Sequence, residues 1–389
     1  RGGCYPSFGR PHDGLGFAPS MMDHLHGSTA ICGLVYYQAD LFPQPFQKRF
    51  YCGNVMTSRI NCNAVERQGA TVTARELPDF MTSEDPWFRP VDIQVGPDGA
   101  MYVADFYNKI IGHYEVPLEH PGRDRESGRI WRIVYRGANS PKLESLTEYQ
   151  KQTADYVILN TDAFAELGST NLTRRELAIE RVRQAKLDQS AMEAVRAKLL
   201  SAETPELLRL SCLAILWSRD ELTSQNIVSL LSNGTPRLQV EALRAANQPP
   251  HGNATPLTTA IGKAFKNPEP QVRLAAIQAI GRCGGAGYVR GLLSMAKQYA
   301  TEDPTTRQAS RIAVRNLLRE PQALEMIVKS WKFSASADEP PTRMTLGLNE
   351  PLAIELANIL PSLDSSLAAE ALLRFVDRNP DASRRKTRY

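Results

Sequence analysis

Long hydrophobic runs, a large charge excess and cysteine are all scarce in this chain of 389 residues. No apolar stretch approaches the roughly 18–20 residues that a membrane-spanning helix needs, so we expect no membrane span. The 46 Lys and Arg residues exceed the 42 Asp and Glu residues by only four, which does not favour a nucleic acid as partner. The one dense basic run lies within residues 381–389, which we interpret as a loose tail.

Six cysteines are too few to require a disulfide framework, and no Cys-x-x-Cys pair or Cys-x-x-Cys-His haem motif occurs. Cys52 and Cys62 lie symmetrically about Thr57, at the centre of an expected β-hairpin. The sequence therefore allows either a disulfide bridge or two free thiols for this pair. Cys212 and Cys283 lie on apolar helical stripes, which predicts unreactive core thiols.

Residues 1–137 have the pattern of short β-strands separated by turns. Residues 91–95 alternate between apolar and polar side chains, residues 96–99 supply a tight Gly-Pro-Asp-Gly turn, and residues 100–105 read as the partner strand. A further strand is expected over residues 128–135. Strands of this length and spacing predict a sandwich, a barrel or a propeller.

After a polar connector at residues 138–168, the apolar period becomes that of α-helices over residues 169–380. Helix starts with Pro in the first turn recur, and aligning them places four residues in register at intervals of 30, 34 and 34 residues. Such helices bury their apolar faces only against neighbouring units, as in a solenoid. The pattern resembles HEAT repeats, with an unrelated helical bundle as the alternative. The aligned residues are Arg209, Gln239, Arg273 and Arg307.

The most distinctive motifs lie in residues 85–136. They are Asp-Pro-Trp-Phe-Arg-Pro at 85–90, the strand–turn–strand that follows, and Gly-Arg-Ile-Trp-Arg-Ile at 128–133. Over roughly residues 27–137 the chain resembles the membrane-bound dehydrogenase family of planctomycete-type bacteria. Those proteins join a β-propeller, related to quinone-dependent sugar dehydrogenases, to HEAT-like repeats and often to a cytochrome domain. The resemblance implies the C-terminal blades of a β-propeller followed by an α-helical HEAT-like solenoid.

The same resemblance implies a periplasmic or cell-surface dehydrogenase that oxidises a sugar or alcohol through a quinone-type cofactor. Pyrroloquinoline quinone and calcium are the cofactors it suggests, and the solenoid would dock a protein partner or a cytochrome domain. The chain begins at Arg1 without a Met or signal peptide, so we expect an internal fragment that is inactive alone. The alternative is a non-catalytic scaffold that binds polysaccharide or protein.

Arg89 matches the place of an arginine that contacts the cofactor in the quinone-dependent enzymes, and a guanidinium suits the carboxylates of an anionic quinone. The alternative is a structural arginine paired with Asp92 or Asp105. Trp87 would stack on a quinone or sugar ring, or else fill space between strands. Asp105 is the candidate calcium ligand.

Tyr107 and Asn108 are candidate substrate-binding residues, although Asp and Asn at a strand end often only order a turn. His26 is the candidate general base for removing a hydroxyl proton, and Ser28 a further substrate contact. Two alternatives exist for His24 and His26: they form a metal-binding pair, or they are two exposed loop histidines. An enzyme should bring Arg89, His26 and Asp105 into one pocket, whereas a scaffold would scatter them.

Overall fold

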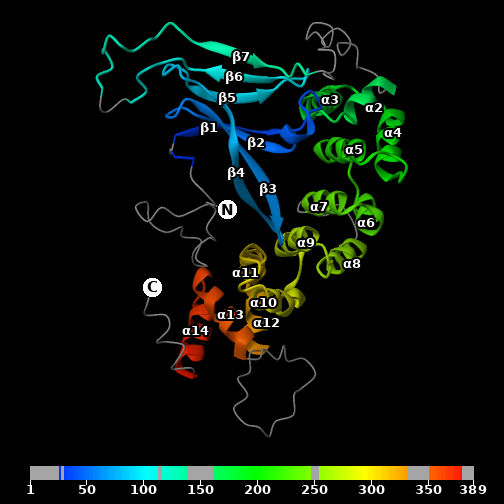
Figure 1. Ribbon diagram of the computed structural model, residues 1–389. Coiled ribbons are helices and arrows are strands. Elements are labelled where there is room, and N and C mark those ends of the chain that lie inside the picture. The colour runs from blue at the N-terminus through cyan, green and yellow to red at the C-terminus, as the bar shows by residue number, and fades with distance from the viewer. Residues whose placement is uncertain are drawn as a thin grey trace. The chain divides into compact units, whose positions relative to one another are not determined.

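The computed structural model describes residues 26–27, 30–112, 116–137, 161–246, 254–330 and 350–378 (Figure 1). By its internal contacts the chain divides into two compact units. The β unit consists of Met22–Arg67 and Val72–Leu222, and the helical unit of Arg1–Met21, Gln68–Thr71 and Thr223–Tyr389. Most of the predicted connector and the whole predicted tail lie outside the described residues.

The β unit contains two antiparallel sheets with the strand orders β1-β2-β3-β4 and β5-β6-β7. Neither sheet closes on itself, and the described residues show no ring of blades, so the β-propeller prediction is wrong. Strand spacing and turn composition are common to propellers and to packed sheets, and the sequence pattern could not separate them. The strands are β1 (Ile31–Tyr37), β2 (Arg49–Asn54), β3 (Arg59–Gln68), β4 (Thr71–Thr82), β5 (Pro90–Val95), β6 (Met101–Asp105) and β7 (Arg129–Ile133).

Two glycines allow the sheets to pack closely where β1 and β2 meet β5. A Cβ atom on Gly33 would lie 2.6 Å from the Cα atom of Asp92, and one on Gly53 would lie 2.1 Å from the carbonyl oxygen of Pro90. Gly33 also has a positive φ of 62°, which disfavours any side chain there. The core that forms between the sheets includes the fully buried side chains of Tyr37, Tyr51, Ile60, Ile93 and Met101.

The strand register answers the question left open for Cys52 and Cys62. Cys62 pairs with Tyr51 and Cys52 pairs with Asn61 across β2 and β3. Because successive side chains of a strand point to opposite faces, the two thiols lie on opposite sides of the sheet. Both cysteines are free.

The helices predicted beyond the connector are confirmed. The first four belong to the β unit: α2 (Thr161–Leu167), α3 (Leu172–Gln184), α4 (Gln189–Leu200) and α5 (Glu206–Ser218). The helical unit holds α6 (Ser224–Asn233), α7 (Pro236–Ala245), α8 (Ala254–Ala264), α9 (Pro270–Cys283), α10 (Val289–Gln298), α11 (Pro304–Leu318), α12 (Pro321–Ser330), α13 (Glu350–Ile359) and α14 (Ser366–Arg378). Short 3-10 turns lie at Gln44–Phe46, Ala286–Tyr288 and Leu360–Ser362.

The turn between β5 and β6 anchors the start of α3. Asn171, the N-cap of α3, donates from its side-chain amide to the carbonyls of Gly96 and Pro97, at 3.1 Å each. The Thr173 hydroxyl donates to the carbonyl of Val95 at 2.6 Å. The Gly-Pro-Asp-Gly turn therefore positions the first long helix as well as closing a hairpin.

Three of the four residues aligned by the repeat perform the same task. Arg209, Gln239 and Arg273 each reach back from the first turns of a helix to a carbonyl at or just beyond the C-terminal end of the preceding helix. Those carbonyls have no partner within their own helix and carry partial negative charge. Arg175 makes the same contact 34 residues before Arg209 and extends the series upstream. The carbonyl acceptors belong to Ser169, Leu199, Leu231 and Asn267.

In the helical unit α9 packs against both α7 and α11, while α6 packs against α7 and α8. Gly281 on α9 permits its close approach to α11, because a Cβ atom there would lie 2.8 Å from the Cα atom of Ala313. No helix in the described ranges is long and apolar enough to cross a membrane, as the sequence predicted.

Candidate functional site

Arg89 lies in a buried network of its own unit. Its side chain donates to the carbonyls of Val55, Asn108 and Lys109 at 2.7–3.2 Å, and to the hydroxyl of Ser58 at 3.2 Å. Arg89 is 8% exposed, and its burial lowers the pKa of the guanidinium. The fork that would bind the carboxylates of an anionic cofactor is therefore engaged by backbone carbonyls.

Asp105, the candidate calcium ligand, is 3% exposed and accepts three hydrogen bonds. One oxygen accepts from the backbone N–H groups of Arg89 and Tyr107, and the other from the indole N–H of Trp131 at 3.0 Å. These contacts fix the end of β6 and the turn that follows. Within the described residues no group of three or more His, Cys, Asp or Glu side chains is arranged to hold a metal ion.

Trp87, Tyr107 and Asn108 lie close to this network. The rings of Trp87 and Tyr107 are 5.5 Å apart, and the guanidinium of Arg129 lies 3.4 Å from the centre of the Tyr107 ring. The Asn108 side chain donates to the carbonyl of Asp124 and accepts from the backbone of Ile110. The structure thus brings together Trp87, Arg89, Asp105, Tyr107 and Asn108. The polar side-chain groups of Arg89, Asp105 and Asn108 are engaged by the protein itself.

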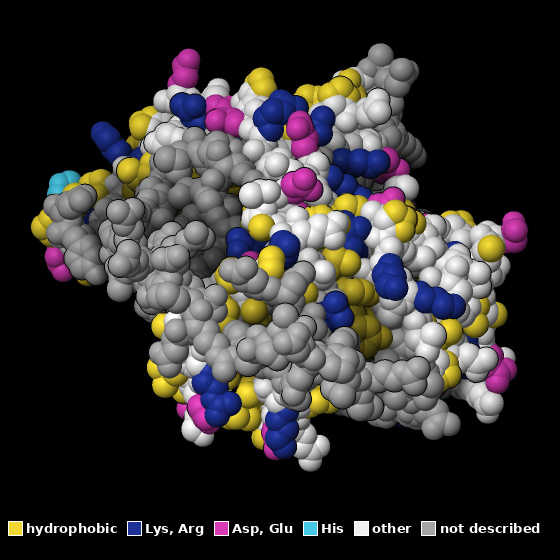
Figure 2. Space-filling model, turned by 90° about the horizontal axis from the view of Figure 1, so that it is seen from below, with side chains coloured by type: hydrophobic (Ala, Val, Ile, Leu, Met, Phe, Trp, Pro, Cys, Tyr) yellow, Lys and Arg dark blue, Asp and Glu magenta, His cyan; other side chains and the backbone are white. Residues whose placement is uncertain are grey.

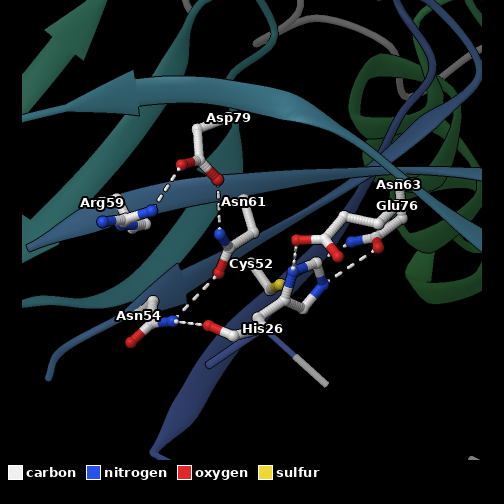
Figure 3. Close-up of polar contacts among 8 residues, drawn as sticks. All are labelled: His26, Cys52, Asn54, Arg59, Asn61, Asn63, Glu76 and Asp79. Carbon is white, nitrogen blue, oxygen red and sulfur yellow. Dashed lines mark hydrogen bonds and ion pairs between the residues drawn. The ribbon is translucent and has the colours of Figure 1, made fainter. Parts of the chain in front are cut away.

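His26 belongs to a different network, on the four-stranded sheet (Figure 3). Its Nδ1 lies 3.0 Å from a carboxylate oxygen of Glu76, and its Nε2 lies 3.0 Å from the side-chain oxygen of Asn63. With the Asn63 amide so oriented, the ring donates to both acceptors only when it is protonated. A general base needs a free ring nitrogen, which this arrangement does not offer. The other candidates of this segment, His24 and Ser28, lie outside the described residues.

A row of buried amides continues from His26 across β2, β3 and β4 (Figure 3). Asn54 donates to the backbone carbonyl of His26 at 3.1 Å and to the side chain of Asn61 at 3.2 Å. Asn61 in turn donates to Asp79 at 2.6 Å, and Asp79 pairs with Arg59 at 2.9 Å. Sequence reasoning missed this row, although polar Asn residues two apart in a strand, at 61 and 63, were a usable signal. Buried amides that satisfy one another rigidify the sheet.

A groove of about 370 Å³ lies along α9 and α11 in the helical unit. Small and apolar residues form part of its lining: Gly281, Ala309, Ile312 and Ala313. Polar groups line the remainder: Thr71, Gln278, Arg282, Thr305, Gln308 and Asn316. None of these ten lining residues is a His, Cys, Asp or Glu, so the groove offers binding groups rather than an acid–base pair.

Asp303, the buried N-cap of α11, positions one end of this groove. One of its oxygens accepts from the backbone N–H of Thr306 at 3.0 Å. The other accepts from the Thr306 hydroxyl at 2.9 Å and from the backbone N–H of Ala70 at 2.8 Å. The turn containing Gly69 and Ala70 is thereby held on α11, and the next residue, Thr71, lines the groove. Sequence reasoning did not find the groove, because its residues come from segments far apart in the chain.

Charge on the exposed surface is mixed. In the face drawn in Figure 2, Lys and Arg side chains are interspersed with Asp and Glu side chains. Nucleic-acid binders concentrate Lys and Arg on one face or along one helix. This face therefore resembles the surface of an ordinary globular protein.

One family model matches part of the chain. A family described as a domain of unknown function (DUF7133) matches residues 10–137, which is the part of the chain that contains both sheets. No curated protein matches the chain, and no solved structure matches it. The dehydrogenase and HEAT-repeat resemblances stay predictions.

Proposed function

We propose that this chain is a non-catalytic binding scaffold whose α9–α11 groove holds an extended segment of a partner protein. The lining of the groove carries this proposal: amide and hydroxyl side chains are combined with small apolar residues. Gln278, Gln308 and Asn316 each carry both a donor and an acceptor, as does every peptide unit of an extended chain. The small residues Ala309 and Ala313 leave room for the side chains of the bound segment.

The size and shape of the groove fit this occupant. Its volume lies within the range of about 300–1,000 Å³ that is usual for ligand sites. Its α11 residues recur at three- and four-residue intervals, from Thr305 to Asn316, so they form one stripe along the helix. A stripe of this kind suits a linear ligand. Exposed Arg282 adds a positive charge that favours an acidic residue in the bound segment.

The dehydrogenase hypothesis receives less support from the geometry. Arg89 and Asp105 are engaged by backbone and indole groups, and His26 lies in a separate network. The periplasmic or surface location stays a prediction, because it depends on the resemblance alone.

Selection of random dodecapeptides displayed on phage, with the full chain as bait, tests the proposed function. We expect selected peptides to bind the purified chain and to bind an Ala309→Arg variant at least tenfold more weakly, because the longer side chain fills the groove. Ala197→Arg, at an exposed position of α4, is the matched control and should bind normally. Failure to select any peptide, or equal binding by Ala309→Arg, would show that the groove is not a peptide site.

A further inference from the structure

Within the part of the chain that the structure describes, the outer edge of β7 is an unpaired strand edge. β7 is the last strand of the order β5-β6-β7 and pairs with β6 only (Figure 1). Along an edge strand, alternate residues direct their N–H and C=O groups away from the sheet. Among the described residues, no group outside β6 hydrogen-bonds to the backbone of Arg129–Ile133. No other described segment therefore pairs with this edge.

The edges at β5 and β4 are covered or guarded. β5 lies against β1, with Gly33 allowing backbone contact near Asp92. β4 contains Pro78, which cannot donate to an added strand, and it also carries the charged residues Arg75 and Asp79. Proline and charge are common protections against edge pairing.

β7 has two arginines, and both contact side chains of their own unit. The guanidinium of Arg129 lies on the Tyr107 ring, and Arg132 forms an ion pair with Asp98. Two large apolar side chains are exposed beside them: Ile130 is 72% exposed and Trp131 is 45% exposed. An edge strand that exposes large apolar side chains is the kind of edge that pairs with another strand.

Trp131 is exposed and yet fixed in orientation. Its indole N–H donates to the buried carboxylate of Asp105 at 3.0 Å, so the ring loses little freedom when a partner covers it. Rigid aromatic side chains of this kind anchor protein interfaces, because ordering a side chain opposes binding. The contact therefore prepares β7 for association.

The charge of the edge indicates the partner. Arg129 contacts rings and makes no hydrogen bond to any described residue, while Asp124 interacts with it only electrostatically. We propose that β7 accepts an added strand from an extended, acidic segment of a partner protein, with an acidic side chain paired to Arg129. A second copy of β7 fits less well, because two copies would gather four arginines in one short ladder. This site lies in the β unit and is independent of the α9–α11 groove.

Hydrogen exchange measured by mass spectrometry on the full chain tests the proposal. The probes are a fluorescein-labelled peptide of alternating Glu and Val, about nine residues long, and its Lys–Val counterpart. We expect the Glu–Val peptide to slow amide exchange in residues 129–133 at least tenfold, and the Lys–Val peptide to have no effect. Exchange at these backbone amides reports strand addition, which contact by side chains alone would not produce.

Charge reversal provides the decisive variant. Arg129→Glu should exchange the preference, so that the Lys–Val peptide binds and the Glu–Val peptide does not, while Arg67→Glu, an exposed control on β3, should keep the original preference. Circular dichroism establishes that each variant is folded. Two results would overturn the proposal: no slowing at residues 129–133 with either peptide, or a dimer in sedimentation whose β7 amides are already protected without peptide.

Discussion

Replacement of Arg89 separates its two candidate roles, a structural one and a cofactor-binding one. The guanidinium makes four hydrogen bonds, three to backbone carbonyls and one to the Ser58 hydroxyl. A hydrogen bond to a charged group contributes about 1.5–3 kcal/mol, and the values do not add for neighbours. Because Arg89→Ala leaves several carbonyls without a partner in a buried site, we expect a loss of about 3–5 kcal/mol in the free energy of unfolding.

Arg89→Lys tests the geometry of the fork rather than the charge. Lysine keeps the positive charge but cannot reach carbonyls on both sides in one plane. We expect a loss of about 2 kcal/mol, intermediate between wild type and Arg89→Ala. Replacement of exposed Arg67 by Ala is the matched control, with an expected change within about 0.5 kcal/mol.

Urea unfolding followed by circular dichroism and by Trp fluorescence measures these differences, because Trp87 and Trp131 lie near the Arg89 network. A second arm titrates the full chain with pyrroloquinoline quinone, with and without calcium. We expect no binding, since the guanidinium is engaged by the protein. A loss of less than about 1 kcal/mol for Arg89→Ala would contradict the structural role of Arg89. Tight binding of the quinone that Arg89→Lys abolishes would contradict it as well.

Three further changes probe the helices and the buried thiols. Gly281→Ala should cost about 1–3 kcal/mol and weaken peptide binding, because the new methyl group meets the backbone of α11, whereas Gly287→Ala meets nothing and should be neutral in the same urea assay. Arg209→Leu should cost about 1–3 kcal/mol by leaving the carbonyl at the end of α4 without its partner, and a thermal melt unchanged within error would contradict the capping role. Burial raises the pKa of the Cys212 thiol to about 12, from an ordinary value near 9. Its contribution to stability is therefore complete below about pH 9 and falls as the pH rises towards 12, so Cys212 should resist iodoacetamide at pH 8 in the folded chain, and Cys212→Ala should reduce the loss of stability between pH 9 and 11.

The order of the halves, strands first and helices after, was predictable because the two periods of apolar residues differ. The arrangement of the strands was not, because closure of a sheet depends on contacts between distant segments. Gly33 and Gly53 show why. Each permits a backbone contact with β5, and neither contact can be recognised from the pattern of apolar and polar residues around it. The Asp and Asn residues at the end of β6 were assigned a second, turn-ordering role from the sequence, and their contacts correspond to that role.

The repeat register was visible in the sequence, but the physical reason for it was not. Arg175 was missed because α3 starts with Asn171 as its cap and lacks the Pro that identified the other helix starts. The alignment depended on the Pro and on the position of a long polar side chain. The structure shows that this position needs a hydrogen-bond donor long enough to reach the end of the preceding helix. A glutamine serves as well as an arginine, as Gln239 shows.

The place where this repeat fails coincides with the groove. Arg307 occupies the repeat position on α11, yet it pairs with Glu355 of α13 at 2.9 Å instead of reaching back to the preceding helix. The cap of the same helix, Asp303, binds the backbone of Ala70 and so holds the turn before Thr71 at the start of α11. Natural proteins depart from their own local rules chiefly at functional sites. The departure at α11 therefore supports the groove beside it, rather than any other face of the helical unit, as the site of partner binding.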